Sequence, residues 1–408
     1  MDRKSLQPFP KKFPIEIASE IVKQMDHEEL CRFSLTNRIY NDEANRVLWR
    51  TVHIAFDSDT GTLVPAAKAI RRDCFRARHI RTLVISPKRI FDGEKPEGGR
   101  WRHSLRMQTM HVPDDVPLWT WKLVAAVIRG VPRLEHLEIA DAPSSWTGLA
   151  KWRSHILDRL LELSVASPLL DLKSFTTSIP LQSKMTLFCA RCPRLERIVL
   201  HKTYPLDDSP NEELPDIPSN AFQCLRHVTG PIDFVSSTTP GHPITEIQTN
   251  MGLSRAKKLR DALLSSSACI QSLHISSIFS SIHPLAPALL CLAPLPITSL
   301  HTHYLLSSHH LPDTGAGRNN SHLWGSEMVH ALTQFSSLEA FQCDIIMQAR
   351  MQQSEIKEDL VSTAERIRFW GKASKTLTTL HFTYKYGNHI EELRFGRKIG
   401  GEWHSDPV

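Results

Sequence analysis

The apolar positions of the first 56 residues repeat at helical spacing and then change to strand spacing. A first helix, beginning at Pro14, is predicted from apolar residues three or four positions apart: Ile17, Ile21, Val22 and Met25. Asp26 and Glu29 have the spacing of a capping box, which predicts the start of a second helix, and Thr36 is a candidate cap for a third. Alternation from residue 51 onward predicts a strand. These short elements bury little surface alone, so we expect part of it to meet a partner.

The same segment contains short motifs in a fixed order: Phe13-Pro14, Glu16-Ile17, Ile21, Glu29-Leu30, Ser34-Leu35-Thr36-Asn37-Arg38 and Leu48-Trp49-Arg50. In this order they resemble the F-box, the helical module that docks onto the small Skp adaptor of a cullin–RING ubiquitin ligase. The closing run is similar to that of many fungal F-box proteins. The resemblance covers residues 13–56 and implies six adaptor contacts: Phe13, Pro14, Ile17, Ile21, Leu30 and Leu35. The alternative is an ordinary three-helix cap on a larger domain.

The rest of the chain, residues 57–408, contains a degenerate repeat of the form apolar-x-x-apolar-x-apolar, the strand signature of leucine-rich repeats. Clear copies begin at Ile80, Leu134, Leu195, Ile270 and Leu377. Weaker copies begin at Leu172, Leu225, Ile297 and Leu338. Helix-like apolar segments precede several copies, at 118–128, 156–163, 185–189, 256–264 and 328–335.

This pattern predicts an α/β protein in which a small all-helical F-box precedes an irregular leucine-rich-repeat-like solenoid with a parallel sheet. Successive copies begin 23 to 54 residues apart, whereas regular leucine-rich repeats contain about 20–29 residues, so we expect inserted loops. Residues 57–408 would form the substrate- or partner-binding domain, and residues 1–12 a disordered N-terminus. A compact α/β domain with similar local patterning is the alternative.

Composition excludes several classes of function. The chain is 41% hydrophobic with a net charge of +6, which is ordinary for a globular protein. Arginines between Arg71 and Arg81 flank apolar positions at helical spacing, which indicates a solvated helix face rather than a nucleic-acid site. The N-terminus lacks the apolar segment of a signal peptide, and no apolar run is long enough to span a bilayer. We therefore expect no membrane, reduced thiols, and a cytoplasmic or nuclear location.

Catalytic motifs are missing from the sequence. Cys189 and Cys192 form a single C-x-x-C without the second pair that zinc requires, so core packing is the favoured interpretation. No phosphate-binding loop, G-x-S-x-G or H-E-x-x-H occurs. We expect neither enzymatic activity nor a cofactor or metal.

Histidine is the unusual component, with 21 residues. The middle residue of each apolar-x-apolar pair projects from the face opposite to its neighbours. In chain order these residues are Val84, Glu138, Val199, His274, His301 and His381. If the strands stack in order, His274 and His301 lie ~4.8 Å apart. A metal or pH-sensing site is conceivable, but the simpler interpretation is a polar concave face whose candidate partner contacts are Glu138, His274, His301 and His381.

Together these features predict the substrate-recognition subunit of a Skp–cullin–F-box ubiquitin ligase. The F-box would bind the adaptor, the repeats would hold an unidentified protein substrate, and the rate gain would come from proximity alone. The alternative is a non-ligase repeat scaffold with a vestigial F-box. Its support lies in Phe13 and Asn37, which differ from the residues typical of the module. An enzyme is the third and weakest hypothesis.

Overall fold

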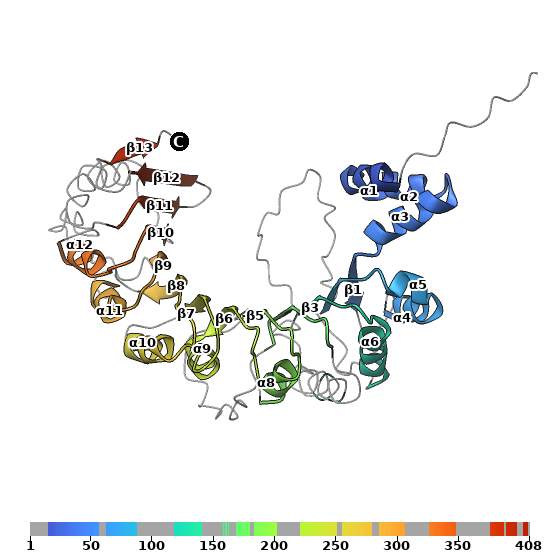
Figure 1. Ribbon diagram of the computed structural model, residues 1–408, viewed down its shortest axis with the longest axis horizontal. Coiled ribbons are helices and arrows are strands. Elements are labelled where there is room, and N and C mark those ends of the chain that lie inside the picture. The colour runs from blue at the N-terminus through green and yellow to red at the C-terminus, as the bar shows by residue number, and fades with distance from the viewer. Residues whose placement is uncertain are drawn as a thin grey trace, which may run out of the picture. The chain divides into compact units, whose positions relative to one another are not determined.

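The protein is a mixed α/β structure with a mostly parallel sheet, as predicted. The computed structural model describes residues 15–56, 63–87, 118–140, 158, 160, 162, 169–179, 183–201, 221–250, 255–279, 285–306, 326–347, 376–386, 389–397 and 403–406. The chain divides into two compact units, the N-terminal unit Met1–Leu172 and the C-terminal unit Lys173–Val408. Each unit combines strands with helices (Figure 1).

The N-terminal unit begins with three helices, α1 (Ile15–Gln24), α2 (His27–Ser34) and α3 (Arg38–Leu48). Their apolar sides meet in a small core, so each helix is stabilised by packing rather than by its own length. The buried residues of this core are Val22, Leu30 and Ala44, and the partly buried ones are Met25, Phe33, Val47 and Leu48.

Side-chain caps define the starts of the second and third helices. The predicted capping box is confirmed: Glu29 N donates to Asp26 Oδ1 at 2.8 Å, and Asp26 N donates to Glu29 Oε2 at 3.0 Å. The predicted cap of the third helix is wrong. Asn37, not Thr36, accepts a hydrogen bond from Ile39 N at 2.8 Å, because the Thr36 hydroxyl donates back to Phe33 O at the end of α2.

Three parallel strands follow in the N-terminal unit: β1 (Thr51–Phe56), β2 (Thr82–Pro87) and β3 (His136–Ile139). Helices α4 (Leu63–Arg72), α5 (Cys74–Ala77) and α6 (Leu118–Gly130) connect them. Helices α4 and α6 pack closely at Gly130, where an added Cβ would lie 2.8 Å from Ile70 Cγ2. This position therefore requires glycine.

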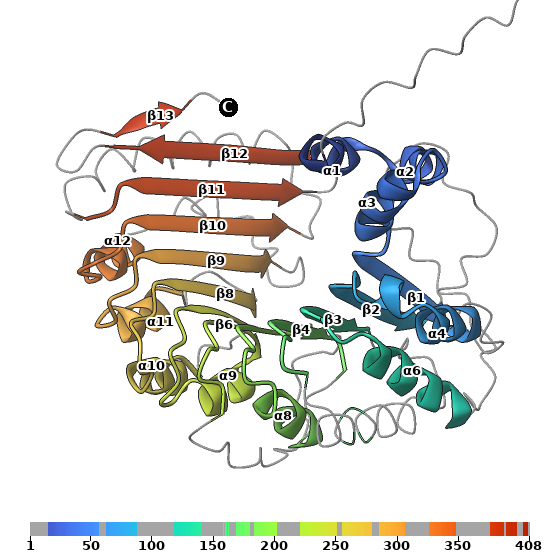
Figure 2. The ribbon, with the colours of Figure 1, turned by 45° about the vertical axis from the view of Figure 1, so that its right-hand side comes forward.

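The C-terminal unit contains eight parallel strands in chain order, followed by two antiparallel ones. The parallel strands are β4 (Ser174–Thr177), β5 (Arg197–Leu200), β6 (His227–Pro231), β7 (Glu246–Asn250), β8 (Ser272–Phe279), β9 (Ser299–Leu306), β10 (Ala340–Met347) and β11 (Thr379–Tyr386). The last two are β12 (His389–Gly396) and β13 (His404–Asp406). One face of this sheet is covered by α8 (Ser183–Ala190), α9 (Ile232–Thr238), α10 (Ala256–Leu264), α11 (Leu285–Leu292) and α12 (Ser326–Thr333) (Figure 2).

All nine predicted repeat copies lead into strands, and one further copy was missed. The missed copy begins at Ile244 and forms β7, where the buried Thr249 occupies the third apolar position. The first position of every copy that leads into β4–β11 is buried: Leu172, the last residue of the N-terminal unit, then Leu195, Leu225, Ile244, Ile270, Ile297, Leu338 and Leu377. The apolar positions of the repeat thus form one continuous core beneath the sheet.

A recurring hydrogen-bond pattern holds the strands in register. One carbonyl just before each strand accepts hydrogen bonds from two consecutive N–H groups at the start of the next strand, at 2.7–3.1 Å. In the C-terminal unit these carbonyls belong to Lys173, Glu196, Arg226, Thr245, Gln271, Thr298 and Glu339. Each of these parallel strands therefore begins level with the strand before it, and equivalent side chains align in rows across the sheet.

Within the described ranges, no helix combines the length and the apolar character needed to cross a bilayer.

Candidate functional site

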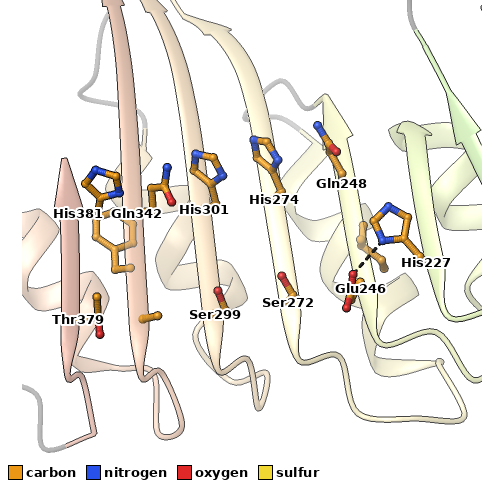
Figure 3. Close-up of a pocket in the computed structure, with 13 residues that line it drawn as sticks. His227, Glu246, Gln248, Ser272, His274, Ser299, His301, Gln342, Thr379 and His381 are labelled. Atoms are coloured by element: carbon orange, nitrogen blue, oxygen red, sulfur yellow. Dashed lines mark hydrogen bonds and ion pairs between the residues drawn. The ribbon is translucent and has the colours of Figure 1, made fainter. Parts of the chain in front are cut away.

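The sheet face that the helices leave uncovered in the C-terminal unit contains a hollow of about 360 Å³. It crosses strands β6 to β11, and Figure 3 shows the side chains that line it. Two rows of polar side chains, two residues apart on each strand, form most of this lining. Because residues i and i+2 of a strand share one face, both rows point away from the apolar core.

The upper row, here called the His/Gln row, contains planar nitrogen-bearing side chains. Its members pair directly in the strand register: Gln248, His274, His301, Gln342 and His381. The lower row, here called the hydroxyl row, consists of Ser272, Ser299 and Thr379, with Ala340 between the last two. The side chains that line the hollow are therefore small in the hydroxyl row and larger in the His/Gln row, one step further along the same strands.

His274 and His301 lie side by side, as predicted from the repeat. Their ring centroids are 4.0 Å apart and their planes differ by 14°, so the two imidazoles stack face to face. His381 belongs to the same row but does not touch His301, because Gln342 of β10 lies between them. The register therefore brings two of the predicted histidines into contact and places the third two strands away.

Asp344 is the principal charge next to the hollow. Its Oδ2 lies 3.2 Å from His301 Nε2 and 3.9 Å from Lys385 Nζ, and its Oδ1 accepts a hydrogen bond from Gln342 Nε2 at 3.1 Å. Burial by itself would raise the pKa of this carboxyl. The contacts with His301 and Gln342 outweigh burial and hold the pKa of Asp344 well below its usual range.

Two imidazoles near Asp344, those of His274 and His303, have lowered pKa values. Burial, together with the neighbouring His301 and His303, lowers the pKa of His274 to about 4. Burial also lowers the pKa of His303, although Asp344 acts in the opposite direction. At neutral pH His274 is therefore an uncharged hydrogen-bonding group.

A second cluster lies at the β6 end of the hollow. His227 Nδ1 is 2.9 Å from Glu246 Oε2, and His227 Nε2 is 3.0 Å from Thr229 Oγ1. A hydroxyl, an imidazole and a carboxylate occur in this order in hydrolase triads. Here strand geometry alone explains both contacts, because Thr229 follows His227 by two residues and Glu246 lies directly opposite it.

The remaining predicted face residues differ in accessibility. Glu138 lies half-buried on β3 in the N-terminal unit and does not line the hollow. Val199 is buried in β5, so it offers no accessible contact at its position in the row. Val84 is half-buried on β2. The register pairs Val199 with the half-buried Thr176 and Thr229, so the alternation of side chains is kept there although three successive residues of β5 are buried.

Within the described part of the chain, no group of three or more His, Cys, Asp or Glu side chains has the arrangement needed to hold a metal ion. The stacked imidazoles offer hydrogen bonds and partial charge rather than a coordination site.

The first helices expose several large apolar side chains. Ile17 is 45% exposed, Ile21 is 38% exposed and Leu35 is 85% exposed, so these three predicted contacts are accessible. Ile15, which the motif did not single out, is exposed as well. Phe13 and Pro14 lie outside the described residues.

Leu30 requires a correction. It was predicted as an adaptor contact, but only 4% of it is exposed, because it packs with Val22 and Ala44 in the core of α1–α3. Its role is to hold the helices together rather than to contact another protein.

Two further predictions concern the C-x-x-C pair and the arginine cluster. Cys189 and Cys192 are buried, and burial raises the pKa of Cys192 to about 12, which confirms core packing. Arg72 and Arg76 are exposed, and Arg76 both pairs with Asp73 at 2.9 Å and lies over the Trp49 ring. Local contacts thus account for this part of the arginine cluster.

Comparison with known proteins adds no assignment: no family model matches the chain, and no curated protein matches it significantly.

Proposed function

We propose that this chain is the substrate-recognition subunit of a Skp–cullin–F-box ubiquitin ligase. In this proposal, helices α1–α3 dock onto the Skp adaptor, and the uncovered sheet face of the C-terminal unit holds the target protein. The observation that carries the proposal is the exposed apolar surface of the first helices, on residues that the F-box resemblance selects.

The distribution of exposed apolar side chains supports a docking role. The described residues expose eight large apolar side chains, and four of them lie between Ile15 and Leu35. Scattered exposed apolar residues are normal, whereas a concentration in one short segment indicates an interaction surface. Ile17 and Ile21 are four residues apart on α1 and therefore lie on the same side of that helix.

The internal construction of the helices supports the same interpretation. Val22, Leu30 and Ala44 form a core of their own, and the Asp26–Glu29 capping box stabilises the start of α2. The exposed isoleucines are therefore not needed to complete the interior. Burying a large apolar side chain contributes about 1.5–3 kcal/mol, so a partner that covers several of them gains substantial affinity.

The proposed mechanism needs no chemistry from this chain. Binding the adaptor at one surface and the target at another holds the target near the ubiquitin-conjugating enzyme. The reaction is accelerated through a higher effective concentration. The parallel sheet with its polar uncovered face provides a broad surface for a target, and the repeat pattern supports its description as an irregular leucine-rich-repeat solenoid.

Co-purification with a Skp adaptor tests the proposal. The double variant Ile17→Asp with Leu35→Asp should reduce adaptor affinity by more than about tenfold, because both side chains would be buried at the interface. Aspartate near the start of α1 is compatible with the helix dipole, so the fold should survive. The matched control is Leu264→Asp with Ile390→Asp, which places the same two charges on exposed apolar residues of the C-terminal unit. Unchanged adaptor binding by the double variant would refute the mapped surface.

The same experiment separates the ligase from a repeat scaffold with a vestigial F-box. A scaffold would retain protein partners but recruit neither adaptor nor cullin. Affinity purification with and without residues 1–56 distinguishes ligase components, which are lost on truncation, from candidate targets, which are retained.

A further inference from the structure

We infer that the hollow between the His/Gln row and the hydroxyl row is a binding site for an acidic segment of a partner protein, an extended peptide that carries Asp or Glu side chains. This inference rests on the proposed function only for its biological role, since such a segment would belong to the target. The binding chemistry itself depends on the C-terminal unit alone.

The carboxylates of this face are already paired. Asp344 is held by His301, Gln342 and Lys385. Glu392 Oε2 lies 2.6 Å from Arg394 Nη2 and 3.4 Å from His381 Nε2. The one carboxylate among the described residues that line the hollow, Glu246, contacts His227 at 2.9 Å. A basic ligand would therefore have to displace an existing partner to find a carboxylate.

Hydrogen-bond donors in the hollow remain available for a ligand. The hydroxyls of Ser272, Ser299 and Thr379 have no hydrogen-bond partner among the described residues, and neither has the amide of Gln248 (Figure 3). Three of these groups lie in one row and the fourth in the row above. Hydroxyl and amide donors satisfy carboxylate oxygens, and a hydrogen bond to a charged acceptor is stronger than one to a neutral acceptor.

The dimensions of the hollow suit an extended peptide. From Gln248 on β7 to His381 on β11 the row crosses four strand intervals. At ~4.8 Å per interval this is about 19 Å, the length of about six extended residues. A volume of about 360 Å³ accommodates side chains entering from such a segment while its backbone stays outside.

The protonation of His274 also favours an acidic ligand. The titratable and charged groups on this face near the stacked pair His274–His301 are Glu246 on β7, His303 on β9, Asp344 on β10, and His381 and Lys385 on β11. Without a ligand, burial and the neighbouring imidazoles disfavour a charge on His274. A bound carboxylate reverses that balance, because an opposite charge nearby raises the pKa of an imidazole. Binding should therefore take up a proton and become tighter as the pH falls.

The experiment uses the full chain and three labelled peptides of about eight residues, matched in length. One alternates Ser with Asp and Glu, one replaces the acids by Asn and Gln, and one replaces them by Lys and Arg. The acidic peptide should bind tightest, and its affinity should rise about threefold between about pH 7 and about pH 5, because protonation of His274 begins only well below neutral pH. Calorimetry in two buffers of different ionisation enthalpy should detect proton uptake.

Variants can be chosen that the sheet already tolerates. His274→Gln places glutamine in a row that contains it at two other positions, and Ser299→Ala places alanine beside Ala340. The first should abolish most of the proton uptake, and the second should weaken binding about two- to fivefold at every pH. His330→Gln removes an exposed imidazole on α12 and should change neither quantity.

Several results would overturn the inference. These are equal or tighter binding of the amide or basic peptide, pH-independent affinity, absence of binding, or an effect of His330→Gln equal to that of His274→Gln. The proposed ligase function fails separately. The variant Ile17→Asp with Leu35→Asp should retain peptide binding, so loss of adaptor binding and loss of peptide binding are distinguishable.

Discussion

His301 and Asp344 lie close together on adjacent strands, with His301 Nε2 3.2 Å from Asp344 Oδ2. Both groups are largely shielded from solvent, and the aspartate remains charged because its contacts outweigh the cost of burial. This pair connects the stacked imidazoles of β8 and β9 to the cation Lys385 of β11. The polar face of the C-terminal unit is therefore organised around one buried carboxylate.

Replacing this carboxylate should destabilise the C-terminal unit. Asp344→Asn should lower the free energy of unfolding by about 1–3 kcal/mol at neutral pH, because His301 and Lys385 lose the negative charge that they contact. A carboxyl with a lowered folded pKa contributes stability above its unfolded pKa and loses it as the pH falls through the folded value. The difference between wild type and variant should therefore shrink below about pH 4, as measured by urea unfolding.

The control for this prediction is Asp233→Asn. Asp233 contacts Arg255 and Lys258, but all three side chains are exposed by 42–51%. Pairs of this kind contribute about 0–1 kcal/mol. Equal losses for the two aspartates would contradict the importance assigned to burial.

Gly130 should be intolerant of even one added carbon. Gly130→Ala places a Cβ 2.8 Å from Ile70 Cγ2, so α4 and α6 must separate, at a cost of about 1–3 kcal/mol. Ile70→Leu removes that methyl branch and should restore part of the loss in the double variant. Thermal unfolding measures both. Gly396→Ala, where an added Cβ meets nothing within 4 Å, should be nearly neutral, and a similar loss there would argue against the steric cause.

The two leucines assigned to adaptor binding should behave differently in the isolated protein. Leu30→Ala removes a core side chain and should cost about 2–4 kcal/mol of stability. Leu35→Ala alters an exposed side chain and should change stability by less than about 0.5 kcal/mol. Chemical denaturation followed by circular dichroism measures the two values. A large loss for Leu35→Ala would mean that the exposed leucine has a structural role.

Thiol reactivity should follow burial. Cys224 and Cys269 are exposed and should react first with a thiol reagent in the folded protein. Cys189, Cys192 and Cys343 are buried, and burial raises the pKa of each, so they should react only after unfolding. Mass spectrometry of the labelled peptides tests this order. Rapid labelling of Cys192 would show that the chain opens around α8.

The strands were predictable because the repeat places apolar side chains at fixed positions on the helix-covered face. The copy that forms β7 has Thr249 at its third position, and threonine fills the same buried position in β4 and β9, whose copies were predicted only as weaker ones, so threonine is a regular member of the repeat there. Helix α11 was missed because its residues are almost all apolar and include Pro287. Proline is acceptable there because it lies in the first turn, where its missing N–H costs no hydrogen bond.

The candidate site was predictable only in part. The contact between His274 and His301 followed from the equivalent positions of two copies. Asp344 and the hydroxyl row were missed because single polar residues on a strand have no periodic signal of their own. They occupy the positions two residues after and two residues before the His/Gln row, so alignment of whole copies, rather than of their apolar positions, would have identified them.

One carbonyl before each parallel strand accepts hydrogen bonds from two N–H groups of the next strand. A change in the length of a connection therefore has a different effect from an insertion within a strand. Connections can be lengthened or shortened without altering which side chains become neighbours on adjacent strands, which explains how such unequal intervals coexist with aligned rows. A single residue inserted within a strand would instead turn every later side chain to the opposite face. The length of the connections and the side chains of the polar rows can therefore change independently of each other.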